Sequence, residues 1–126
     1  MDKSLLLSLC GIYNLLFALF HISFWKIFKW KQDLKNNTIG NRAIMQILNI
    51  RLIYIFLLMS FIYFFYQKQL IETEIGFVLL LGFLGFWIGR TIEQFIFLRV
   101  ESKMVRILTI VFFVGIIIHL LPIVIK

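Results

Sequence analysis

Hydrophobic residues of this chain are concentrated in four long stretches that carry few charges. The stretches cover about residues 5–25, 43–66, 75–98 and 107–125. Each is close to the roughly 20 residues that a helix rising about 1.5 Å per residue needs to cross about 30 Å of hydrocarbon. Runs such as FVLLLGFLGFW and IIIHLLPIVI are continuously apolar, whereas a membrane strand alternates lipid-facing and lumen-facing residues. The pattern therefore predicts an all-α protein with four membrane-spanning helices.

The linkers between these stretches are short. They cover about residues 26–42, 67–74 and 99–106, and none has room for a second domain. Short links make neighbouring helices run antiparallel. We therefore expect a single transmembrane domain over residues 1–126, folded as an up-down-up-down four-helix bundle.

Composition supports a membrane protein. Hydrophobic residues make up 62% of the 126 residues and charged residues only 15%, where a soluble domain has about 25% charged residues. Too few polar groups are present to cover the surface of a soluble domain of this size. The single cysteine excludes an internal disulfide framework and a cysteine-based zinc or iron–sulfur site within one chain. We expect no metal and no cofactor.

The distribution of lysine and arginine predicts the orientation. The first linker contains Lys26, Lys29, Lys31, Lys35 and Arg42, and the third contains Arg99, Lys103 and Arg106. The second linker has only Lys68, beside Glu72 and Glu74. Basic linkers stay in the cytoplasm, so we expect a multi-pass membrane protein with both termini on the non-cytoplasmic side. The bias toward Lys, Ile, Asn and Phe favours a bacterial inner membrane as its location. A cleaved signal peptide is the alternative for the first stretch, but that stretch lacks a clear basic start and a small-residue cleavage site.

The basic linker after the first stretch, WKIFKWKQDLKNN, predicts a membrane-surface helix. Ile27, Trp30 and Leu34 recur at helical spacing among lysines, as in a helix lying on anionic lipid head groups. The candidate surface residues are Lys26, Lys29, Trp30, Lys31 and Lys35. Nucleic acid is the competing partner for a basic and aromatic run, but this run adjoins a span and has no larger basic surface behind it. The expected partner is therefore the lipid bilayer, and no nucleic acid.

Polar residues inside the predicted spans are the natural place to seek function, because a charge at the bilayer centre costs about 2.5–3.5 kcal/mol on insertion scales. One group lies within roughly 6–12 Å of the cytoplasmic side at 1.5 Å per residue. We call it the polar layer, and it consists of His21, Gln46, Asn49, Arg90 and Glu93. Arg42 shares a helix face with Gln46. Arg51 lies slightly deeper and off that face, so we expect it to extend toward the interface or to reach the layer from its edge.

A second group lies deeper in the membrane. His119 is roughly 18 Å from the cytoplasmic side, near the level of Cys10 and Asn14. An offset of about 10–12 Å between the two histidines argues against one haem iron held by both, because its ligands must approach opposite faces of a single iron. In the third stretch Gly82, Gly85 and Gly89 form a stripe of small residues that would allow helices to pack closely.

No sequence motif for a soluble-substrate enzyme is present: the chain lacks His-Glu-x-x-His, a Walker loop, a dinucleotide glycine fingerprint and Cys-x-x-Cys. Our leading hypothesis is a non-enzymatic protein whose polar layer fastens the bundle or binds a lipid-soluble ligand or a partner helix. One alternative is an enzyme acting on a lipid or isoprenoid, with Glu93 or His21 as acid–base group and Arg42, Arg51 or Arg90 holding an anionic head group. Another is a proton- or ion-coupled carrier assembled as a homo-oligomer.

The stretches FALFHISFWKIFKW, NRAIMQILNIRLIYIFLL and GRTIEQFIFLR resemble a group of small bacterial integral membrane proteins known only as hypothetical proteins. The resemblance extends over nearly all four spans. It implies a four-helix membrane fold and a bacterial membrane location. It implies no activity and assigns no functional residue.

Overall fold

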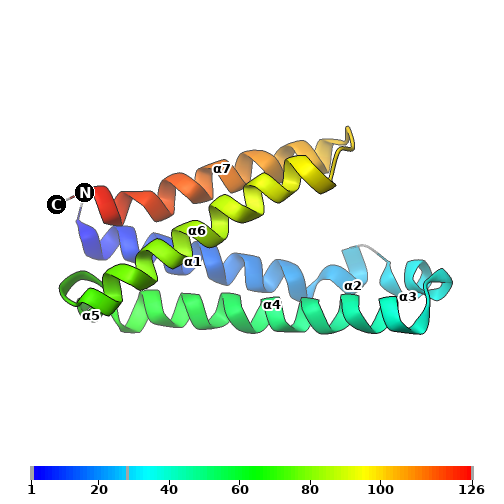
Figure 1. Ribbon diagram of the computed structural model, residues 1–126, viewed down its shortest axis with the longest axis horizontal. Coiled ribbons are helices and arrows are strands. Elements are labelled where there is room, and N and C mark those ends of the chain that lie inside the picture. Colours follow the sequence, from blue (N-terminus) through cyan, green and yellow to red (C-terminus); the bar gives the residue numbers. More distant parts are fainter. Residues whose placement is uncertain (1, 28, 126) are drawn as a thin grey trace.

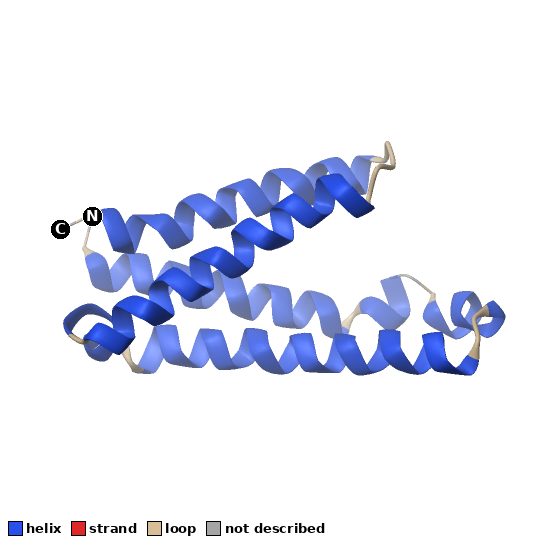
Figure 2. Ribbon diagram, in the orientation of Figure 1, coloured by secondary structure: helices blue, strands red, loops and turns tan. Residues whose placement is uncertain are grey.

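The computed structural model describes residues 2–27 and 29–125, and the regular structure of this part is helical (Figure 2). The prediction of an all-α fold is confirmed. The elements are α1 (Lys3–Ile22), α2 (Phe24–Ile27), α3 (Trp30–Asp33), the 3₁₀ helix η1 (Leu34–Asn36), α4 (Ile39–Phe65), α5 (Gln67–Glu72), α6 (Glu74–Phe97) and α7 (Lys103–Val124), and Figure 1 labels the α-helices. Of these, α1, α4, α6 and α7 are each long and apolar enough to cross a membrane, as expected of an integral membrane protein.

The starts of the long helices are set by polar caps. The side chain of Thr38 accepts a hydrogen bond from the backbone N–H of Asn41, and Ser102 does the same for Val105. Such caps satisfy N–H groups that the first helical turn leaves without a partner. They start α4 and α7 at Ile39 and Lys103, about one turn before the apolar stretches, because hydropathy does not register a polar first turn.

The long helices lie side by side in two pairs (Figure 1). Helix α1 packs along α4, helix α6 packs along α7, and α1 also contacts α7. Both termini and α5 lie at one end of the molecule, which we call the closed end, and α2, α3 and the connection 98–102 lie at the opposite end (Figure 1). The two pairs diverge toward that opposite end (Figure 1).

Close packing of the helices depends on glycine. A Cβ atom at Gly115 of α7 would overlap the hydroxyl of Tyr13 on α1, and one at Gly76 would overlap the backbone carbonyl of Gln69. The stripe Gly82, Gly85 and Gly89 was expected to serve this purpose. That prediction is wrong, because nothing lies within 4 Å of a Cβ built at any of these three positions.

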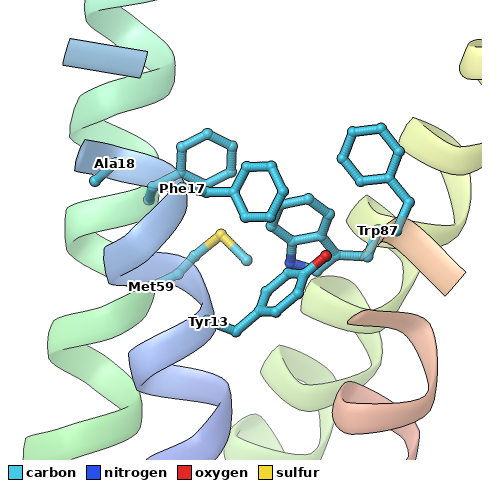
Figure 3. Packing of buried hydrophobic residues seen from close by; sticks show 7 residues of the cluster. Tyr13, Phe17, Ala18, Met59 and Trp87 are labelled. Atoms are coloured by element: carbon cyan, nitrogen blue, oxygen red, sulfur yellow. The ribbon is translucent and has the colours of Figure 1, made fainter. Parts of the chain in front are cut away.

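The core between the pairs is aromatic (Figure 3). Trp87 of α6 is fully buried, and its ring stacks on Phe56 of α4 at 5.4 Å with an interplanar angle of 13°. The ring of Tyr13 meets it edge-on at 4.9 Å, and Phe17 lies 4.8 Å away. Stacked and edge-to-face ring pairs contribute about 0.5–1.5 kcal/mol each beyond their buried area. Trp87 therefore joins α6 to both helices of the other pair.

The basic segment after α1 does not form the single surface helix that was predicted. Lys29 has φ of 51°, a left-handed conformation that ends α2 before α3 begins. The chain turns there, and the ring of Trp30 packs 5.7 Å from Phe24 and 5.9 Å from Trp25. Trp30 and Leu34 are consequently buried against the protein, at 9% and 3% exposure, instead of facing lipid. The lysines at positions 26, 29, 31 and 35 remain exposed.

Candidate functional site

A buried hydrogen-bond network connects three of the long helices. The amide nitrogen of Asn14 on α1 lies 3.0 Å from Nε2 of His119 on α7 and donates to the carbonyl of Cys10 at 2.8 Å. The indole N–H of Trp87 on α6 donates to Oδ1 of Asn14 at 3.2 Å. Nδ1 of His119 lies 2.7 Å from the carbonyl of Gly115. Asn14, Trp87 and His119, which we call the buried network, have 0% exposure.

The geometry of the buried network determines the state of His119. A carbonyl oxygen only accepts, so Nδ1 of His119 carries the hydrogen that binds Gly115. Nε2 then accepts from Asn14, whose second amide hydrogen binds Cys10. The imidazole is neutral, and each of its nitrogens has a partner inside the protein. The buried network is thus suited to fastening helices and offers no vacant donor to a ligand.

A cavity of about 270 Å³ lies between the helix pairs, beyond Trp87 toward the end that holds α2 and α3. Its walls come from α1, α2, α4, α6, α7 and Leu98, which directly follows α6, and most of the lining side chains are aromatic rings. We call it the aromatic cavity, and it is lined by Phe17, Phe20, His21, Phe24, Leu52, Phe56, Phe86, Trp87, Arg90, Leu98, Leu108 and Phe112. His21 and Arg90 are its charged or titratable lining residues.

His21 is fixed on one wall of the aromatic cavity. Its Nδ1 lies 2.9 Å from the carbonyl of Phe17 and therefore carries a hydrogen, so Nε2 of the neutral imidazole is an acceptor. The imidazole stacks on the ring of Phe24 at 4.3 Å and lies 4.9 Å from Phe56. The backbone carbonyl of His21 accepts from the amide of Asn49 on α4 at 3.0 Å. Helices α1 and α4 are joined at this level, and the imidazole is held in position.

Arg90 brings a positive charge to the opposite wall. Its guanidinium lies 4.7 Å from the centre of the Phe112 ring, a cation–π contact between α6 and α7. The side chain is half-buried. An arginine in a membrane span is stabilised by such contacts and by any anion or hydrogen-bond acceptor that enters the site. The aromatic cavity therefore offers a cationic donor and an imidazole acceptor within apolar walls.

The predicted polar layer is only partly assembled. His21 and Arg90 line the aromatic cavity, and the side-chain amide of Asn49 donates a hydrogen bond to the backbone carbonyl of His21. Gln46 is half-buried and does not line the cavity. Glu93 is exposed. It lies on the face of α6 that bears the glycine stripe, and this face points away from the bundle, whereas the buried residues of α6 are on the other side.

The other candidate residues from the sequence also lie apart from the aromatic cavity. Arg42 is half-buried near the start of α4. Arg51 is exposed, and its guanidinium lies 5.9 Å from the centre of the Tyr54 ring on the same helix, so it is directed away from the aromatic cavity. Asn14 and His119 belong to the buried network, at the shared depth that the sequence indicated.

Sequence reasoning missed Trp87, which links the buried network to the aromatic cavity. Its position gave a usable signal, because tryptophan is enriched at membrane interfaces and Trp87 lies within a span. A tryptophan inside the bilayer needs a partner for its N–H, and that partner is Asn14. Gln94 was also not among the candidate residues, although it is 2% exposed and its amide nitrogen donates to the hydroxyl of Thr109 on α7 at 3.4 Å.

Within residues 2–27 and 29–125, no cluster of three or more His, Cys, Asp and Glu side chains could hold a metal ion. Comparisons of the chain with protein-family models, with curated proteins and with solved structures find no match. Function is therefore inferred from the geometry of the aromatic cavity.

Proposed function

We propose that this chain is a bacterial inner-membrane protein of four antiparallel spans that binds a lipid-soluble molecule in the aromatic cavity. The ligand has an apolar body and one oxygen-bearing polar end. That end accepts a hydrogen bond from Arg90 and donates one to Nε2 of His21, as a carboxylic acid or a hydroxyl compound can. The single observation that carries the proposal is the presence of Arg90 and His21 in otherwise apolar walls.

The composition of the aromatic cavity supports this function. Ligand sites are mostly apolar and aromatic, with a few polar groups that fix orientation. The volume of about 270 Å³ is just below the roughly 300–1,000 Å³ of sites for drug-sized ligands. The cavity therefore accommodates the polar end of a lipid-like molecule and the part next to it, and the remainder extends along the diverging helix pairs into the bilayer.

Fastening and binding are served by different residues in this proposal. The buried network uses its polar atoms within the protein, which supports a fastening role for Asn14 and His119. Binding is assigned to His21 and Arg90. Glu93 does not line the aromatic cavity, so a non-catalytic binder is favoured over a lipid or isoprenoid enzyme or a carrier that uses this carboxylate.

The orientation is part of the proposal. The connections 23–38 and 98–102 lie at the same end of the molecule, and they and the adjoining first turns of α4 and α7 carry most of the linker lysines and arginines (Figure 1). This end is assigned to the cytoplasm, and both termini to the other side. The aromatic cavity is nearer the cytoplasmic leaflet in this arrangement, and its ligand enters from that leaflet.

Tryptophan fluorescence tests the binding. The variant Trp25→Phe/Trp30→Phe retains Trp87, in the cavity wall, as its only indole. Titration in detergent micelles with oleic acid should change Trp87 emission at lower concentration than titration with methyl oleate, because the ester has neither a proton to share with Nε2 of His21 nor a negative charge to face Arg90. In Arg90→Gln, oleic acid should bind about 10- to 100-fold more weakly, the effect of losing a charged hydrogen bond.

The matched control is Arg51→Gln, which removes the same charge from an exposed position in a neighbouring span. Its affinity for oleic acid should equal that of the parent. Equal affinity for acid and ester, or a loss in Arg51→Gln as large as in Arg90→Gln, would reject the proposed recognition by His21 and Arg90.

A further inference from the structure

A second recess lies outside the aromatic cavity, between the end of α6 and the start of α7. Its volume is about 580 Å³, and it shares only Leu98 with the lining of the aromatic cavity. We call it the hairpin groove. Its charged residues are Arg99, Glu101 and Arg106, and Gln94 and Thr109 add polar groups.

The connection between the two helices brings both arginines to the rim of this groove. Arg99 follows the end of α6, and Arg106 is in the first turn of α7, where its backbone N–H binds the carbonyl of Ser102. Both side chains are exposed. The amino terminus of α7 adds the positive end of its helix dipole. The rim thus attracts an anion at the level where two apolar helices leave the hydrocarbon.

The remaining walls suit the rest of a phospholipid. Phe95 and Ile110 are 56% and 64% exposed on the membrane side of the groove, where acyl chains would lie. Gln94 is 2% exposed; its amide nitrogen donates to Val105 and Thr109, and its buried Oε1 has no partner. Glu101 is a second acceptor. The two guanidinium groups can bind a phosphodiester, and the two acceptors beside them can bind hydroxyl groups on the same molecule.

We infer that the hairpin groove binds the head group of an anionic phospholipid of the phosphatidylglycerol type. Arg99 and Arg106 hold the phosphodiester, since guanidinium groups match phosphate oxygens geometrically. The glycerol hydroxyls donate to Glu101 and Gln94, and the acyl chains lie along Phe95 and Ile110. Two arginines and one glutamate give the groove a net charge of +1, which one anionic lipid neutralises and a zwitterionic lipid does not.

Native mass spectrometry of the full chain released from detergent micelles tests this site, with dioleoyl phosphatidylglycerol, phosphatidylethanolamine and phosphatidylcholine as probes. The first phosphatidylglycerol should bind most tightly. Arg99→Gln/Arg106→Gln should weaken its binding about tenfold or more, to the level of the other two lipids. Both arginines are exposed, so this variant is expected to fold. The control Lys68→Gln/Lys103→Gln removes two charges outside the groove and should bind like the parent.

Two further variants test the roles of Glu101 and of the aromatic cavity in this binding. Glu101→Gln retains an acceptor and should bind phosphatidylglycerol at least as well as the parent. Arg90→Gln should also retain this binding, because the inference requires a bilayer but no occupant in the aromatic cavity. Equal affinity for the three lipids, an unaffected double arginine variant, or a preference for phosphatidylethanolamine that Glu101→Gln abolishes would overturn it.

Discussion

Asn14 and His119, separated by 105 positions in the sequence, meet in the interior through Nδ2 and Nε2 at 3.0 Å. The contact joins the first long helix to the last. Each partner is held in place by a carbonyl of its own helix, that of Cys10 for Asn14 and that of Gly115 for His119. The orientation of both side chains is therefore set before they meet, and the contact fixes the axial register of α1 against α7.

His119→Phe should destabilise the protein, because one amide hydrogen of Asn14 then has no acceptor. A double-mutant cycle with Asn14→Leu isolates the pair, and its coupling energy should be about 0.6–1.7 kcal/mol, between the mean and the maximum measured for hydrogen bonds within a membrane protein. Unfolding in mixed micelles with increasing dodecyl sulfate gives the four free energies. Single effects that add within about 0.3–0.5 kcal/mol would show that the contact has no energetic role.

The sequence predicted the depth of these residues but not the rotation of α6. Counting 1.5 Å per residue placed His119 at the level of Asn14, which depends only on helix rise. Rotation is harder, because lipid-facing and buried faces of a span are equally apolar and leave little periodicity to interpret. The glycines and Glu93 made one face of α6 look like the packing face, whereas the structure buries Trp87, Thr91 and Gln94 on the other.

Trp87→Phe should lower the free energy of unfolding by about 1–3 kcal/mol, because Oδ1 of Asn14 loses its donor inside the protein. The smaller ring also weakens the stack on Phe56. Trp25→Phe is the control, because Trp25 is 45% exposed beyond the end of α1 and its change should stay within about 0.5 kcal/mol. If both substitutions changed the free energy of unfolding equally in the same micelle titration, the hydrogen bond and the ring stack of Trp87 would not contribute to stability as proposed.

Gly115→Ala should destabilise the protein by about 1–3 kcal/mol, because the new methyl group overlaps the ring and hydroxyl of Tyr13. Tyr13 cannot retreat freely, since its hydroxyl donates to the carbonyl of Val111 at 2.9 Å. Gly85→Ala is the matched substitution in another long helix. It meets nothing within 4 Å and should be neutral or stabilising by up to about 1 kcal/mol through helix propensity.

The double variant Gly115→Ala/Tyr13→Phe tests whether overlap with the Tyr13 hydroxyl causes the loss of stability in Gly115→Ala. Removing the hydroxyl takes away the atom nearest to the added methyl, so part of the loss should be recovered. A Gly85→Ala protein less stable than Gly115→Ala would mean that the glycine stripe, and not Gly115, is the packing surface. The spacing of glycines in the sequence could not distinguish Gly115 from Gly85. A glycine allows close packing only where a neighbouring helix approaches it, and the sequence does not show which helix face has such a neighbour.

Lys35 and Lys68 should lie on opposite sides of the membrane. In bacterial cells with a permeabilised outer membrane, a membrane-impermeant maleimide should label Lys68→Cys readily. It should label Lys35→Cys only after the inner membrane is disrupted, because the linker richer in lysine and arginine stays in the cytoplasm. The unsubstituted chain is the control, since its only cysteine, Cys10, is buried and should give little signal.

Labelling of Lys35→Cys in intact spheroplasts, with protection of Lys68→Cys, would invert the proposed orientation. The hairpin groove would then face the outer leaflet of the inner membrane, because the connection 98–102 lies at the same end as α3 (Figure 1), and Lys35 is in η1, which directly follows α3. Its phosphatidylglycerol and the ligand of the aromatic cavity would both have to come from that leaflet. Equal labelling of both positions in intact spheroplasts would instead contradict a membrane-spanning arrangement of the chain.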